Sequence, residues 1–81
     1  MGRPSMFTIR RRELILELIR SGTSRRRAAI ASGIDPSTLV KWMRRGEQAR
    51  HPESMYRRFQ EDVLAAEVDP MMRVLRSTRD E

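Results

Sequence analysis

The chain has 81 residues and contains no cysteine, one histidine, one Trp, one Tyr and two Phe. The absence of cysteine excludes a disulfide framework and a thiolate metal site, and it suits a reducing compartment. The single histidine, His51, has no nucleophile beside it, and the chain has no glycine-rich phosphate loop. We therefore expect no enzyme, with no catalytic residue, no metal ligand and no cofactor.

Long apolar runs are also missing. No stretch approaches the about 20 consecutive apolar residues that a membrane-spanning helix needs. The first residues lack the apolar core of a signal peptide, so we expect the protein to remain in the compartment where it is made. A chain of this length supplies one small domain with a thin core.

Lys41 is the only lysine of the chain, so arginine carries nearly all of the positive charge. The net charge is +6, and it is unevenly spread. Residues 1–50 carry twelve basic and four acidic side chains, a net +8, whereas residues 51–81 carry five and seven, a net −2. Because a guanidinium bonds phosphate in a bidentate manner, the first half predicts a polyanionic partner. The second half, with its net negative charge, predicts a surface that binds a different partner.

Apolar residues at helical spacing predict an all-α fold of four to five helices. The expected helices cover approximately residues 9–20, 24–32, 36–46, 54–68 and 70–78. In the first helix, Leu14, Ile15, Leu18 and Ile19 form the apolar stripe. Leu16 points away from this stripe, so it is expected either to touch the C-terminal helix or to be exposed. In the second, the expected core face is Ala28 and Ala29 with Ile30 or Ala31.

Polar and special residues predict where these helices begin and end. Thr8, Ser24 and Asp35 are expected N-caps, and Pro36 suits the first position of the third helix. Gly22 and Gly33 are expected to end the first two helices with a positive φ. In the last part of the chain, Asp69 and Pro70 predict a break or kink between a fourth and a short fifth helix.

The residues from Ala29 to Trp42 have the order typical of a helix-turn-helix. Ala29 is small enough for two helices to touch, and Gly33 allows the tight turn. Leu39 and Trp42 then anchor the second helix of the motif. The predicted organisation is a flexible basic arm at residues 1–7, a helix-turn-helix DNA-binding domain at 8–50, and C-terminal helices at 51–81 for packing or oligomerisation.

If Leu39 and Trp42 face inward, the opposite side of their helix faces the solvent. In a helix-turn-helix this side enters the major groove of DNA. The expected DNA-binding side chains of this helix are Ser37, Thr38, Lys41, Arg44 and Arg45. Arg44 suits guanine, for which arginine makes the commonest specific contact, and Arg45 suits phosphate.

Two further clusters of arginine and one single arginine extend this expectation. Arg25, Arg26 and Arg27 lie in the first turn of the second helix, where a nearby phosphate backbone would offset their unfavourable interaction with the helix dipole. Residues 10–12 are three arginines that suit a general electrostatic footprint. Arg3 lies in Gly2-Arg3-Pro4, the core tripeptide of AT-hook arms, and suits a narrow minor groove. The alternative for this tripeptide is a disordered tail.

Several motifs together resemble the N-terminal DNA-binding domain of bacteriophage terminase small subunits, over approximately residues 1–68. They are Met-Gly-Arg-Pro-Ser at the start, Ile-Arg-Ser-Gly at 19–22, Ala-Ala-Ile-Ala-Ser-Gly-Ile-Asp-Pro-Ser-Thr-Leu-Val-Lys-Trp at 28–42, Gly-Glu at 46–47, Tyr-Arg-Arg-Phe at 56–59 and Ala-Ala-Glu at 65–67. The resemblance implies recognition of viral DNA for genome packaging in the host bacterial cytoplasm. It also implies a homo-oligomer and a large terminase ATPase–nuclease subunit as partner.

Other functions share parts of this pattern. The helix-turn-helix residues also resemble those of resolvases and transposases. A transcription regulator, or an excisionase or recombination accessory factor of a mobile element, is therefore the alternative among DNA-binding proteins. A third hypothesis is a protein-interaction module whose positive charge is incidental.

Overall fold

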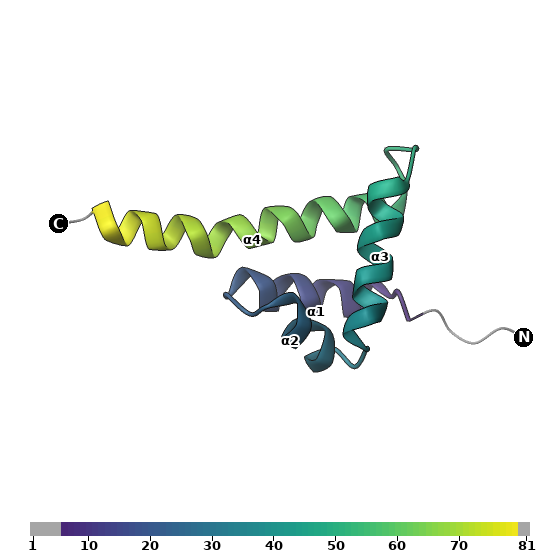
Figure 1. Cartoon of the computed structure of the whole chain (residues 1–81), viewed down its shortest axis with the longest axis horizontal. Coiled ribbons are helices and arrows are strands. Elements are labelled where there is room, and N and C mark those ends of the chain that lie inside the picture. The colour runs from purple at the N-terminus through teal and green to yellow at the C-terminus, as the bar shows by residue number, and fades with distance from the viewer. Residues whose placement is uncertain (1–5, 80–81) are drawn as a thin grey trace, which may run out of the picture.

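The computed structural model describes residues 6–79, and within this range all regular secondary structure is α-helical, with short turns between the helices. The helices are α1 (Ile9–Arg20), α2 (Arg25–Ala31), α3 (Pro36–Gln48) and α4 (Met55–Arg79). Figure 1 shows α1, α2 and α3 gathered together, with α4 lying along α1 and reaching past it. The expected all-α fold is confirmed, with four helices in the described residues.

Each of the first three helices begins at its expected cap. The Thr8 hydroxyl accepts the Arg11 N–H at 3.2 Å, and the Ser24 hydroxyl accepts the Arg27 N–H at 3.2 Å. Asp35 accepts the backbone N–H that lies two residues further on at 2.9 Å. These side chains satisfy amides that have no partner inside their own helix.

Glycines with positive φ close α1 and α2. At Gly33 φ is 86°, and its N–H donates to the Ile30 carbonyl at 3.1 Å. The Ile34 N–H donates to the Ala29 carbonyl at 3.0 Å, which completes a Schellman motif and returns the Ile34 side chain to the core. Gly22 ends α1 in the same way, with φ of 101°. The turn predicted between the two motif helices is confirmed.

The core contains side chains from all four helices, from Phe7 ahead of α1 and from Ile34 in the turn between α2 and α3. Its buried apolar members are Phe7, Ile15, Leu16, Ile19, Ala28, Ala29, Ile34, Leu39, Trp42, Phe59, Val63 and Ala66. The expected stripe of α1 was wrong at Leu14, which is 40% exposed, and of the two alternatives for Leu16 the buried one holds, since it is 8% exposed. Because α4 packs along α1, the buried face turns toward Leu16. In α2 the core face stops at Ala29, and both Ile30 and Ala31 are exposed.

The predicted arm was too long by at least one residue, because Phe7 is buried. Its ring stacks on Tyr56 at a centroid distance of 4.2 Å and meets Trp42 edge-on at 4.9 Å. Arg11 holds the preceding backbone by donating from Nη1 to the Met6 carbonyl at 2.9 Å. Phe7 therefore fixes the point at which the chain joins the domain.

α3 and α4 approach closely at Gly46, which is buried inside α3. A Cβ at this position would lie 2.6 Å from the Gln60 Cβ and would also overlap the Tyr56 carbonyl oxygen. Only glycine therefore allows the two helices to pack at this distance. This contact sets how α4 crosses the motif.

The break expected at Asp69 and Pro70 was wrong, because α4 continues through Pro70 to Arg79. Proline removes one N–H donor, and a helix of 25 residues keeps the hydrogen bonds on both sides of it. The apolar side chains beyond the core-facing part are exposed: Val68, Met71, Met72, Val74 and Leu75. Among residues 6–79, no helix is both long and apolar enough to cross a membrane.

Candidate nucleic-acid interface

The outward face of α3 carries polar and basic side chains opposite its buried anchors. Leu39 and Trp42 are 2% and 6% exposed. A helix turns by about 100° per residue. Ser37, Lys41 and Arg44 therefore point away from the core, and all three are exposed. This is the face that the sequence predicted for DNA.

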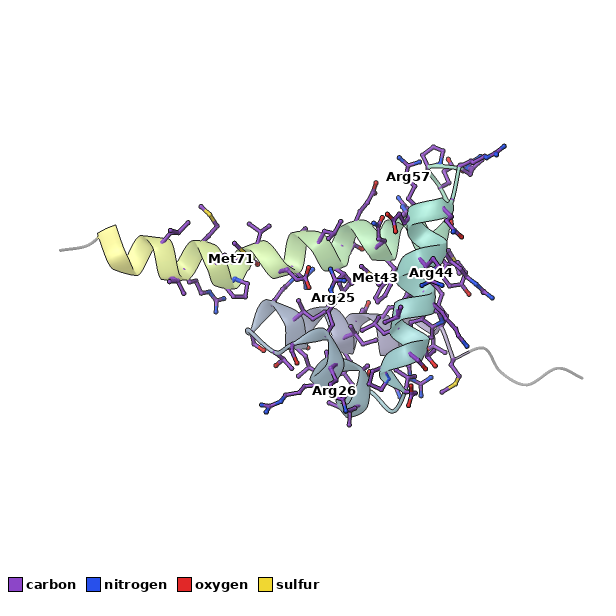
Figure 2. The ribbon with its side chains drawn as sticks, viewed as in Figure 1. Arg25, Arg26, Met43, Arg44, Arg57 and Met71 are labelled. Atoms are coloured by element: carbon purple, nitrogen blue, oxygen red, sulfur yellow. The ribbon has the colours of Figure 1, made fainter. Side chains whose placement is uncertain are left out.

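Arg26 of α2 adjoins this face across a groove of about 520 Å³ between α2, α3 and α4. Arg26 and Arg44 line the groove, and the apolar part of its lining includes Met43 and Leu64. Figure 2 shows Arg26 on α2 and Arg44 on α3. Two guanidinium groups from different helices thus border one exposed surface.

The N-terminus of α3 brings a carboxylate and two cations together. The Ser37 hydroxyl and N–H both donate to Asp35, and these two hydrogen bonds lower the pKa of the Asp35 carboxyl below its usual range. The positive charges of Arg26 and Lys41 lower this pKa further. Since the Ser37 hydroxyl hydrogen is given to Asp35, its oxygen remains an acceptor toward any ligand.

The sequence predicted that Arg25 is free to bind DNA, but in the structure its guanidinium is paired with Glu67. Its Nε donates to Glu67 Oε2 at 2.6 Å and its Nη2 to Glu67 Oε1 at 2.8 Å, so the pair is bidentate. These hydrogen bonds raise the pKa of Arg25, against the opposing effect of partial burial. Arg25 therefore joins α2 to α4, and Figure 2 shows it on the side of α2 that faces α4.

The other two arginines of α2 lie apart from each other. Arg27 is exposed and borders a hollow of about 370 Å³ with the turn before α2, whereas Arg26 borders the groove beside α3. Both are exposed and available to an anion. The three consecutive arginines thus occupy three different environments.

The remaining predicted residues of α3 lie on its other flank. Thr38 is half-buried, and Arg45 turns toward α4. Arg45 Nη1 donates to the Tyr56 hydroxyl at 3.2 Å, and the guanidinium carbon lies 5.3 Å from the centre of that ring. Arg45 is therefore placed beside Tyr56, a residue that was not among the predicted DNA-binding side chains.

The arginines at the start of α1 contribute to the fold more than the sequence indicated. Arg11 Nε donates to the Ser32 carbonyl at 2.9 Å, which joins α1 to the end of α2. Arg12 lies over the Phe7 ring at 4.7 Å. Arg3, the predicted minor-groove residue, lies outside the described residues.

The structure thus brings Arg26, Ser37, Lys41 and Arg44 onto one surface. It places Arg25 and Arg45 in contacts with α4 instead. A scan against models of known protein families found no match, and searches of curated proteins and of solved structures found none either. The function is therefore inferred from the side chains of this surface.

Proposed function

We propose that the chain is a helix-turn-helix protein that binds double-stranded DNA with α3 in the major groove. The observation that supports this most is the exposed face of α3, where Lys41 and Arg44 lie opposite the buried Leu39 and Trp42. The major groove is about 12 Å wide and admits a helix of this kind. Arg26 supplies a cation from the preceding helix, which in this motif crosses the phosphate backbone.

The proposed contacts differ in what they recognise. Arg44 can form two parallel hydrogen bonds with O6 and N7 of guanine, and Lys41 can donate to the same acceptors. The Ser37 oxygen, as an acceptor, suits an amino group on a base edge. Arg26 and Arg27 suit phosphates, which fix the position of the protein but carry no sequence information.

Arg3 is proposed to contact the minor groove next to this site. Phe7 is packed against Trp42 of α3, so the chain joins the domain beside the proposed reading helix. Arg3 and Phe7 are four positions apart in the sequence, so their Cα atoms can be separated by at most about 13 Å. This reach is comparable to the distance between neighbouring grooves of a duplex.

For the biological role, we propose recognition of viral DNA during genome packaging in the host bacterial cytoplasm. Support comes from the resemblance of residues 1–68 to the DNA-binding domain of terminase small subunits. The proposed partner is a large terminase ATPase–nuclease subunit. Co-purification with that subunit supports this role, whereas repression of the chain's own promoter would instead identify a transcription regulator.

We propose that the exposed end of α4 joins copies of the chain. Val68, Met71 and Leu75 recur at spacings of three and four residues, and they are 49%, 64% and 56% exposed. Such spacing places them along one side of the helix. Sedimentation of the wild-type chain and of Met71→Glu tests this, and a wild-type chain that stays monomeric at all concentrations would contradict it.

The DNA-binding proposal is tested with fluorescently labelled duplexes of random sequence. Binding should weaken steeply as salt increases, because bound phosphates release counterions. Rounds of selection should then enrich one sequence. A wild-type chain without salt-sensitive affinity for any duplex would refute the proposal and favour a protein-interaction module.

A further inference from the structure

Tyr56 and Arg45 are joined by one hydrogen bond, and this bond occupies only part of the hydrogen-bond donors of the two side chains. The Tyr56 hydroxyl accepts from Arg45 Nη1 at 3.2 Å, so the hydroxyl oxygen serves as an acceptor. Within residues 6–79, its own hydrogen has no acceptor. A guanidinium has five N–H donors, and this contact uses one of those on Arg45. One O–H and several N–H groups are therefore available side by side.

The tyrosine ring is held in place from beneath. It stacks on Phe7 with an interplanar angle of 13° and a centroid distance of 4.2 Å. Phe7 in turn meets Phe59 edge-on at 5.4 Å, and Phe59 is 2% exposed. Because these aromatic contacts fix the ring, the hydroxyl keeps its position beside Arg45. A ligand that binds here meets a group already in place.

The chemistry of the pair suits an oxyanion. The available groups are donors, and one of the two side chains carries a positive charge. Phosphate oxygens accept only, and tyrosine and arginine are both among the side chains that contact the phosphates of DNA. A planar guanidinium beside a hydroxyl can bind two oxygens of one phosphate.

The position of the pair relative to α3 indicates which phosphate it meets. At about 100° per residue, Arg44 and Arg45 lie on either side of Lys41 around the helix. The flank of Arg44 faces Arg26 across the groove, whereas the flank of Arg45 faces Tyr56. A helix in the major groove has a phosphate backbone on each side. The two flanks therefore face different strands.

We propose that Arg45 and Tyr56 bind a phosphate of the DNA strand opposite the strand bound by Arg26. This inference rests on the proposed function and adds Tyr56 to the residues that contact DNA. α4 thereby contributes directly to the interface. The motif is held in the groove from both sides, by α2 on one strand and by α4 on the other.

The test compares the full chain with Tyr56→Phe, which removes the hydroxyl and keeps the ring. Tyr56→Phe should melt near the wild-type temperature and bind every duplex about tenfold to a hundredfold more weakly, as expected for one hydrogen bond to a charged group. Arg57→Gln is the control on the same helix, because Arg57 pairs with Glu61 and lies outside the proposed contact. The control should reduce affinity only through its general charge.

The partner phosphate is identified with duplexes that carry one neutral methylphosphonate at successive positions. At one position the replacement should weaken the wild-type chain, and Tyr56→Phe should lose little further affinity there. Fully additive losses at every position, or wild-type affinity in Tyr56→Phe, would overturn the inference while DNA binding stands. A wild-type chain that binds no DNA would overturn both this inference and the proposed function.

Discussion

Arg25 of α2 and Glu67 of α4 form a bidentate ion pair, with N···O distances of 2.6 and 2.8 Å, that joins the two helices across the edge of the interface groove. The two side chains are 42 residues apart in sequence. The pair removes one cation from the surface that otherwise carries Arg26 and Arg44. It thereby separates an arginine that stabilises the fold from arginines proposed to bind DNA.

Replacing Glu67 with Gln should release Arg25 toward a phosphate. We expect tighter binding to all duplexes and a salt dependence steeper by about one unit of log–log slope. The loss of folding stability should be below about 1 kcal/mol, because solvent screens this ion pair. The side chains of Arg25 and Glu67 are 43% and 34% exposed. Glu61→Gln changes the net charge equally and is the matched control. Equal gains in both variants would show that Arg25 is not released toward DNA.

Arg26 and Arg44 should differ in the kind of affinity that they provide. Arg26→Ala should weaken all duplexes alike and reduce the salt slope by about 1, as expected for a phosphate contact. Arg44→Ala should weaken the selected sequence more than others, by about 1–3 kcal/mol at one base pair. Competition binding with single-base variants of the selected duplex measures this. Identical behaviour of the two variants would contradict the assignment.

Gly46→Ala should destabilise the domain even though alanine favours helices. The added Cβ would meet the Gln60 Cβ at 2.6 Å and overlap backbone of α4. Overpacking of this kind costs about 2 kcal/mol. Gln48→Ala, at an exposed position near the end of the same helix, should change the free energy of unfolding by less than about 0.5 kcal/mol. Urea denaturation compares them, and an unchanged midpoint for Gly46→Ala would show that α3 and α4 pack less closely.

The cap at Asp35 should make stability depend on pH in the acid range. Its pKa is lowered in the folded protein by the hydrogen bonds from Ser37, so the charged form is favoured by folding. This contribution is present above the ordinary aspartate pKa of about 4 and is lost as the pH falls through the lower folded value. Asp35→Asn retains a capping oxygen but cannot ionise. Its melting temperature should therefore fall less than that of the wild type between about pH 5 and about pH 2, the range in which the Asp35 carboxyl takes up its proton. Parallel acid profiles would contradict this.

Local signals in the sequence predicted the motif well. Ser24, Gly33 and Asp35 act through hydrogen bonds and backbone conformation within a few residues, so their roles can be inferred without the rest of the fold. The inward positions of Leu39 and Trp42 follow from helical spacing alone, and they place Lys41 and Arg44 outside. The core of the proposed site therefore follows from the sequence.

The positions that the sequence missed depend on where α4 lies. Arg25 is paired because α4 packs beside it, and no pattern within α2 indicates this. For Leu16 the sequence left contact with the C-terminal helix and exposure both open, and only the position of α4 decides that it is buried. Phe7 precedes the first helix, and only the arrangement of Trp42, Tyr56 and Phe59 provides its pocket. Pro70 predicted a break because proline removes a backbone donor, but the single lost hydrogen bond does not end a helix of 25 residues.

Amide chemical shifts of the full chain during titration with the selected duplex test the central claim most directly. We expect the largest changes at Ser37, Lys41 and Arg44 of α3 and at Arg26 of α2. Glu13 and Glu17, on the exposed side of α1, should change little. Changes centred on α1, or no changes at DNA concentrations that saturate binding in other assays, would contradict recognition by α3.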